Sequence, residues 1–295
     1  MNARRGSGVA LITAIATWGA LLAGCRPRDP AGSAETFALL RSARDLVVES
    51  RLDEARTRFE QAIALEPACA PAHVEFGYFL LEDAVVSEYG RAIEQFELAQ
   101  RLDPDDPFAL CGLGIALQEL GDADRAEPLL RASLASERVQ RTPGRTMVAT
   151  AALAKIVAIR GRTDEALARF AEAARSPAAT PRARAIYLTS RAELLKEAGR
   201  EAEAEAELRE AIGLDPEDPR AHHHLASLLS RRGERAEAQK ELRIHEILRQ
   251  LVDSKARRFR LDVEGTLRLR RELVAVWPEF EAHAARANSA KTGQR

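Results

Sequence analysis

One residue pattern recurs along this chain and limits the fold more than any other feature. An alanine is followed by an aromatic residue four positions later, by a second alanine three positions further on, and then by a proline. Residues spaced three and four apart lie on one face of an α-helix, and proline ends a helix. Leucine replaces the aromatic residue in the last copy, and the proline of the third copy comes one residue early. The copies are Ala55/Phe59/Ala62/Pro67, Ala92/Phe96/Ala99/Pro104, Ala166/Phe170/Ala173/Pro177 and Ala204/Leu208/Ala211/Pro216.

A partner helix is predicted upstream of each pattern, with a small residue at the point where helices cross. These small residues are Ala43, Gly77, Gly114, Ala154, Ala192 and Ala226. A glycine that follows the partner helix supplies the positive φ that ends it. The turn glycines are Gly121, Gly161, Gly199 and Gly233. Helix-forming residues dominate the composition and strand-forming runs are nearly absent, so the chain is expected to be all-α.

This helix–turn–helix unit resembles the tetratricopeptide repeat (TPR), which has a period of 34 residues. The resemblance implies a right-handed α–α superhelix in which stacked pairs bury a shared core. The tryptophan typical of the first helix is missing from every copy. The six expected repeats are residues 36–69, 70–106, 107–140, 147–180, 185–218 and 219–252. Extra residues are expected in a turn near Val86 to Gly90, and short linkers are expected at residues 141–146 and 181–184.

The repeat pattern fades after residue 252. Helical spacing still runs from Arg257 to Val276, and Trp277 and Pro278 end it. We expect residues 253–287 to form a degenerate repeat or capping helices, because a terminal repeat needs an atypical outer face. Residues 288–295 are expected to form a disordered tail.

The N-terminal segment indicates secretion and lipidation. Arg4 and Arg5 precede an apolar run from Val9 to Leu22, and Leu22-Ala23-Gly24-Cys25 follows. Basic residues, an apolar run and small residues in this order are typical of a secretory signal. The four residues ending at Cys25 resemble the lipobox of bacterial lipoproteins. The resemblance implies that residues 1–24 are removed, that Cys25 is acylated, and that residues 25–35 form a flexible tether.

The alternative is an uncleaved membrane anchor, for which the run is short, because a spanning helix needs about 20 apolar residues. Two or three acyl chains bind a membrane stably where one does not. In enterobacteria, an aspartate after the lipidated cysteine retains a lipoprotein at the inner membrane. Arg26 follows Cys25 here, so the resemblance favours the outer membrane, facing the periplasm, in an organism that has one. In an organism without an outer membrane, the protein would lie on the outer cell surface.

The charge balance argues against a nucleic-acid-binding function. The formal net charge is −1, from 44 basic and 45 acidic residues, whereas nucleic-acid-binding proteins are normally basic. No nucleic-acid partner is therefore expected.

The two cysteines after Cys25 are not expected to form a disulfide, which needs Cα atoms within about 7 Å. Cys69 is predicted in a turn and Cys111 inside a helix, so we expect two separate, mostly buried thiols.

Catalytic motifs are largely absent. The sequence has no Gly-x-Ser-x-Gly, no phosphate-binding glycine loop, no Cys-x2-Cys and no His-Glu-x2-His. Gly112 and Gly114 match the start of a dinucleotide motif, but no strand precedes them, so we interpret them as helix-crossing glycines. His222, His223 and His224 point about 100° apart on a helix, so together with His245 they are expected to be structural. No metal, cofactor or catalytic residue is predicted, and the protein is not expected to be an enzyme.

A basic stretch from Lys255 to Arg271 has two interpretations. It is either a solvated helix face, since acidic residues interrupt it, or a site for an anionic partner or lipid headgroups.

The first helices of TPR pairs line the groove in which the family binds extended peptides or helices. By this resemblance, the predicted groove is apolar with aromatics in its first half and polar or charged in its last two repeats. This suggests an amphipathic partner segment, with its apolar part near the first three repeats. The chain lacks the lysine-and-asparagine clamp that recognises chaperone C-termini, because Asn2 and Asn288 are its only asparagines. The predicted groove residues are Phe37, Leu40, Arg44, Val48, Val74, Tyr78, Glu82, Phe108, Cys111, Ile115, Glu119, Ala151, Lys155, Ile159, Ile186, Thr189, Glu193, Glu197, Arg220, His223, Ser227 and Arg231.

These features together predict a lipid-anchored scaffold of the bacterial envelope that binds other envelope proteins. A regulatory subunit of a peptidoglycan or polysaccharide enzyme has the same sequence features and stays open as an alternative. A third alternative, of a different class, is a metal-dependent enzyme that uses the histidine cluster.

Overall fold

A computed structural model describes residues 32–82, 86–255, 263–278, 280 and 282, and all regular structure in these residues is helical. The chain divides into two compact units, unit 1 (Met1–Ala179) and unit 2 (Thr180–Arg295). The expected signal peptide, most of the expected tether and the expected tail lie outside the described residues. The all-α fold and the repeated helix pairs are confirmed.

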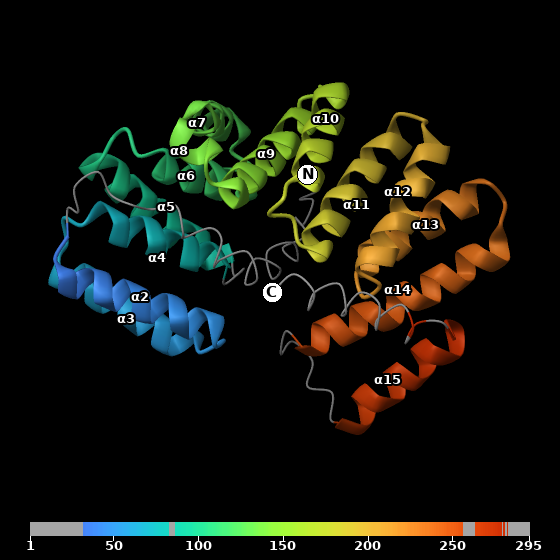
Figure 1. The fold of residues 1–295 in the computed structure, drawn as a ribbon. Helices are drawn as coiled ribbons and strands as arrows, with labels where there is room; N and C mark the ends of the chain where they lie inside the picture. The colour runs from blue at the N-terminus through green and yellow to red at the C-terminus, as the bar shows by residue number, and fades with distance from the viewer. Residues whose placement is uncertain (1–31, 83–85, 256–262, 279, 281, 283–295) are drawn as a thin grey trace. The chain divides into compact units, whose positions relative to one another are not determined.

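Unit 1 contains four helix pairs in chain order, α2 with α3, α4 with α5, α6 with α7, and α9 with α10. Each pair also packs on the next, which gives the consecutive stacking visible in Figure 1. The short helix α8 joins the third pair to the fourth. The helices are α2 (Ala34–Val48), α3 (Leu52–Leu65), α4 (Ala70–Glu82), α5 (Val86–Leu102), α6 (Pro107–Glu119), α7 (Ala123–Ala135), α8 (Glu137–Gln140), α9 (Pro143–Ile159) and α10 (Thr163–Arg175).

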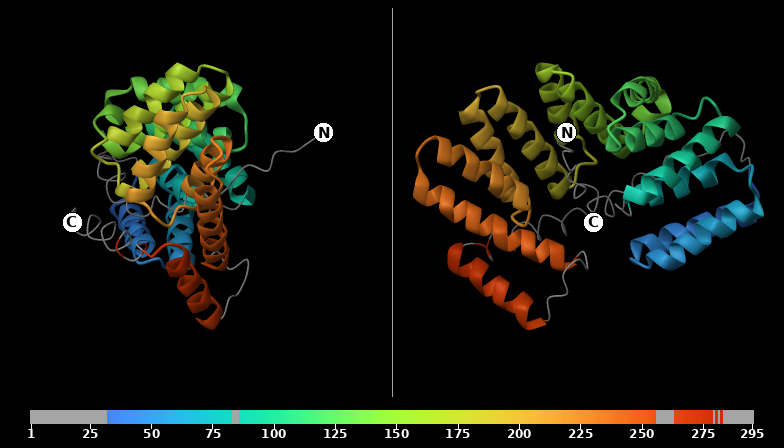
Figure 2. Two further views of the ribbon diagram at one scale, coloured as in Figure 1. Left: turned by 90° about the vertical axis from the view of Figure 1, so that its right-hand side faces the viewer. Right: turned by 180° about the vertical axis from the view of Figure 1, so that it is seen from behind.

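Unit 2 contains two further pairs and a final helix. Helix α11 pairs with α12, α13 pairs with α14, and α15 packs on α14, as the views in Figure 2 also show. The ring centres of Trp277 and His222 are 5.2 Å apart, so the segment after α15 covers the first helix of the last pair. The helices are α11 (Pro181–Glu197), α12 (Glu201–Leu214), α13 (Pro219–Arg231), α14 (Arg235–Lys255) and α15 (Val263–Val276).

The pattern residues form the core of each pair. Phe59, Phe96 and Leu208 are completely buried, and the alanines at helix crossings have no exposed surface where the pairs meet. Each of the four predicted turn glycines has a positive φ, between 74° and 84°, as a helix-ending glycine requires. Cys69 and Cys111 are buried free thiols, as predicted.

Three local expectations are wrong. Residues 143–146 and 181–184 are not linkers but the first turns of α9 and α11, and Val86 to Gly90 lie in α5 rather than in a turn. Proline at the first position of a helix is compatible with helical geometry, so Pro143 and Pro181 begin helices instead of separating them. No helix in the described ranges is long and apolar enough to span a membrane.

Candidate functional site

A buried cluster of charged and aromatic residues lies on the first helices of unit 1. Arg44 donates two hydrogen bonds to the carboxylate of Glu75, at 2.9 and 2.8 Å, and thereby joins α2 to α4. The Arg145 side chain, from the first turn of α9, is almost completely buried. Its guanidinium carbon lies 3.9 Å from the ring centre of Tyr78 and 4.8 Å from that of Phe108. Four first helices are therefore linked through this cluster.

Burial dominates the protonation chemistry of the cluster. Loss of solvent raises the pKa of the Glu75 carboxyl, although Arg44 and, to a smaller extent, Arg145 oppose the shift. It also raises the pKa of Tyr78, whose hydroxyl donates a 3.0 Å hydrogen bond to the carbonyl oxygen of Phe108. The pKa of the Cys111 thiol is raised for the same reason, so this thiol is a poor nucleophile.

The burial also changes the interpretation of the predicted groove in unit 1. Most of its apolar members are core residues in the structure, because neighbouring first helices meet there and Arg145 covers the rings of Tyr78 and Phe108. That a partner contacts them stays a prediction. The buried members are Leu40, Val74, Tyr78, Phe108, Cys111, Ile115 and Ala151.

A smaller set of predicted groove residues in unit 1 remains accessible. Val48 and Ile159, at the ends of α2 and α9, are 62% and 74% exposed. Phe37 is half-buried, and Lys155 donates a 3.0 Å hydrogen bond to Glu119 of the preceding first helix. The side chain of Glu82 lies outside the described residues.

Most of the predicted groove residues of unit 2 are accessible. We call this set the first-helix surface of unit 2. Thr189 is an exception, because its buried hydroxyl donates to the carbonyl oxygen of Ala185 at 2.9 Å. Arg220 and Arg231 are paired with Asp218 and Glu201. The first-helix surface of unit 2 comprises Ile186, Glu193 and Glu197 on α11 and Arg220, His223, Ser227 and Arg231 on α13.

Two histidines stand where the family tryptophan is missing, and both are structural. The ring nitrogens of His73 lie 2.8 Å from Gln95 Oε1 and 2.9 Å from the carbonyl oxygen of Pro67. His222 repeats this arrangement, with Nδ1 2.6 Å from Glu241 and Nε2 3.3 Å from the carbonyl oxygen of Pro216. Each histidine thus ties its own second helix to the turn that precedes its repeat. The structural role predicted for His222 agrees with these contacts.

The other histidines that the structure describes in unit 2, His223, His224 and His245, have different surroundings. His224 Nδ1 lies 3.4 Å from Lys196 Nζ, and burial together with this lysine lowers the pKa of His224 to about 4. Partial burial, His245 and Lys196 lower the pKa of His223. The ring of His223 meets that of His245 at 5.0 Å between centres.

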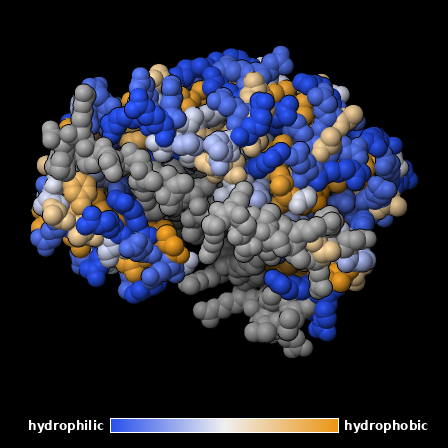
Figure 3. Space-filling view, in the orientation of Figure 1, coloured by the Kyte–Doolittle hydropathy of each residue, from blue (hydrophilic) through white to orange (hydrophobic). Residues whose placement is uncertain are grey.

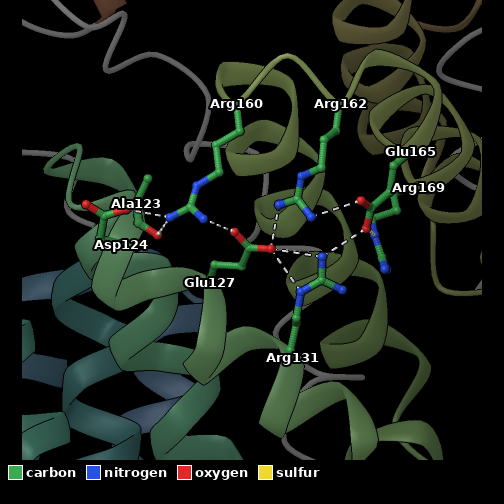
Figure 4. A network of polar contacts seen from close by, with 8 residues as sticks. All are labelled: Ala123, Asp124, Glu127, Arg131, Arg160, Arg162, Glu165 and Arg169. Carbon is green, nitrogen blue, oxygen red and sulfur yellow. Dashed lines mark hydrogen bonds and ion pairs between the residues drawn. The ribbon is translucent and has the colours of Figure 1, made fainter.

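A charged network on the second helices of unit 1 was not predicted from the sequence. Glu127 of α7 lies at its centre (Figure 4). The Glu127 carboxylate is 2.9 Å from Arg131, 2.8 Å from Arg160 and 2.5 Å from Arg162. Glu165 accepts from Arg131 at 3.1 Å and from Arg169 at 3.0 Å. The network fastens α7 to the turn between α9 and α10.

The arginines of this network keep its central carboxylate ionised. Burial opposes ionisation of Glu127, but Arg162 and Arg131 outweigh it and lower the pKa of the Glu127 carboxyl. Arg131 and Glu165 are 34 residues apart, which is one repeat length. Opposite charges at this separation on successive second helices are the sequence signal that could have revealed the network.

Most of the visible surface is hydrophilic, with hydrophobic residues scattered among charged ones (Figure 3). Of the basic stretch, Arg268, Arg270 and Arg271 are exposed, and Arg268 lies 3.8 Å from Glu272. Residues 256–262 of this stretch lie outside the described residues.

The repeated helix pairs, their packing and matches to family models together identify the family of this chain. Tetratricopeptide repeat models match residues 40–107 and 151–219, residues 107–132, and residues 195–250. The chain is a tetratricopeptide repeat protein. Among curated proteins, none matches it.

Solved structures share this fold at low sequence identity. One is the APC/C hetero-tetramer Cut9-Hcn1, with a TM-score of 0.61 and 17% identity over 89% of this chain and 44% of that chain. The TPR protein thus spans less than half of that chain. Another is pilF of Pseudomonas aeruginosa, with a TM-score of 0.50 and 16% identity over 73% of this chain and 96% of that chain. YrrB, described as a TPR protein with an unusual peptide-binding site, has a TM-score of 0.46 and 16% identity over 72% of this chain and 97% of that chain. At these identities the likeness shows the fold alone.

Proposed function

We propose that this TPR protein is a lipid-anchored scaffold of the bacterial cell envelope, held in the outer membrane through acylated Cys25 and facing the periplasm. The fold indicates a protein–protein interaction scaffold, because stacked helix pairs offer an extended surface to a partner. The proposed partner is an extended or helical segment of another envelope protein. TPR proteins are generally non-catalytic, and we propose no catalytic residue for this one.

The first-helix surface of unit 2 carries the binding part of this proposal. It presents the carboxylates of Glu193 and Glu197 on α11 and the side chains of His223 and Ser227 on α13, and all four are at least partly accessible. The first helices of unit 1 present little apolar surface, because Arg145 and its neighbours bury most of it. A segment with a polar, charged face therefore fits better than the amphipathic segment predicted from the sequence.

The sequence around Cys25 carries the anchoring part. A host bacterium that produces the full chain should incorporate labelled palmitate into the protein and retain it in the membrane fraction. Cys25→Ser should abolish the label, because serine has no thiol for an acyl chain. Cys69→Ser is the matched control, since this buried thiol should not be acylated. The anchor would be contradicted if the unsubstituted protein took up no label, or if the Cys25→Ser protein were labelled to the same extent as the unsubstituted protein.

A further inference from the structure

The run of three histidines on α13 does not act as a unit, because each ring has different contacts. Both ring nitrogens of His222 face oxygen acceptors, Glu241 and the carbonyl of Pro216. Nδ1 of His224 faces the ammonium of Lys196. Only His223 turns toward another imidazole that comes from a different helix, that of His245 on α14.

The hydrogen bond of His245 selects the form of the ring that binds metals. Its Nδ1 lies 2.8 Å from the carbonyl oxygen of Pro219, which can only accept, so Nδ1 carries the proton. In the neutral ring, Nε2 then holds a free lone pair. Histidines that bind metals usually have this arrangement, in which one nitrogen donates to a carbonyl and the other coordinates the ion.

The separation of the two rings suits a shared ion. Two imidazole nitrogens that bind one ion at about 2.0–2.1 Å with a tetrahedral angle place their ring centres roughly 5 Å apart. The rings of His223 and His245 are 5.0 Å apart, and both side chains are reachable from solvent. Imidazole is a preferred ligand of zinc, copper and nickel.

We propose that His223 and His245 form a two-histidine site for a divalent transition-metal ion, with water completing the coordination. The described residues contain no group of three or more histidine, cysteine, aspartate or glutamate side chains placed to hold a metal. The site is therefore weaker than a closed structural site, which has four protein ligands. The Glu193 carboxylate, which lies 4.0 Å from His224 Nε2, favours a cation near His223, whereas Lys196 opposes it.

The site joins α13 to α14 within the last repeat. A bound ion would therefore stabilise unit 2 and bring a positive charge to the first-helix surface of unit 2. The inference does not depend on the proposed scaffold function, because it concerns only contacts inside one helix pair.

Calorimetric titration of the purified chain without a polyhistidine tag tests the site, with Zn²⁺ and Ni²⁺ as probes. We expect one ion per chain and a higher unfolding temperature in its presence. His223→Gln and His245→Asn should each weaken binding by about tenfold or more. Asparagine keeps a donor for the carbonyl oxygen of Pro219 but removes the coordinating ring. Circular dichroism of each variant establishes that the helices are intact.

His224→Gln is the matched control and should leave the affinity unchanged. Equal weakening by His224→Gln would show that the histidine run chelates like a tag, and would overturn the proposal. Absence of binding by the unmodified chain would overturn it as well. Undiminished binding by the His223→Gln variant would also overturn the proposal. Because His223 is exposed, this variant provides the test even if His245→Asn does not fold.

Discussion

Replacing Gly112 with alanine should destabilise unit 1 by about 1–3 kcal/mol, the usual cost of overpacking a core. A Cβ atom at this position of α6 would lie 2.2 Å from two atoms of the Phe96 ring. That ring cannot retreat, because Gly77 approaches it from α4 and the ring of Tyr78 packs against it edge to face, with 5.0 Å between the two ring centres. The strain exceeds the gain of about 1 kcal/mol that alanine brings to a helix interior.

Urea unfolding followed by circular dichroism measures this effect. Gly90→Ala is the matched control, because Gly90 lies in α5, the helix that carries Phe96, and a Cβ there meets nothing within 4 Å. It should stabilise the chain by up to about 1 kcal/mol. A second substitution, Phe96→Leu, should recover part of the stability lost in Gly112→Ala. Equal stability of the two alanine variants would contradict the packing described for α4, α5 and α6.

Arg145→Ala should cost unit 1 about 3–5 kcal/mol, the range for removing one partner of a buried charge cluster. The substitution empties the space over the rings of Tyr78 and Phe108 and removes a cation that acts on the buried carboxylate of Glu75. Arg145→Lys keeps the charge but not the planar group that lies over the rings, so its stability should lie between those of the unsubstituted protein and the Arg145→Ala variant.

Arg138→Ala is the control for Arg145, because Arg138 also contacts the Phe108 ring, at 5.2 Å, but its side chain is 50% exposed. Its guanidinium also lies 3.4 Å from the buried carboxylate of Asp106. Because half of the Arg138 side chain is in water, its loss should cost clearly less than the loss of Arg145. The same unfolding measurement compares the variants. An Arg145→Ala protein as stable as Arg138→Ala would show that the cluster does not hold the first helices together.

The helix pairs could be predicted because their signals are local. A single helix pair needs a small residue where its helices cross, an aromatic residue three or four positions from an alanine, and a glycine in its turn. The structure has these residues where the sequence predicts them. Pro143 and Pro181 misled the prediction, because proline both ends and begins helices and the sequence does not distinguish the two.

The candidate site was harder to predict because it depends on contacts between repeats. Arg145 lies in a segment that was expected to be a linker, where a charged side chain is normally exposed, and its burial depends on rings supplied by α4 and α6. The pairing of His223 with His245 likewise needs the register of α13 against α14. The charged network around Glu127 needs residues from α7, from the turn between α9 and α10, and from α10, which come together only when the helix pairs stack.

Binding of an envelope partner to the first-helix surface of unit 2 is tested most directly by site-specific photo-crosslinking in living cells. A photoreactive residue at Glu193 or Ser227 should give the same discrete adduct with one envelope protein. The same residue at Ala206, which is exposed on the second helix α12, should give none. The absence of an adduct at the first two positions, or an identical adduct from Ala206, would contradict partner binding at the first-helix surface of unit 2.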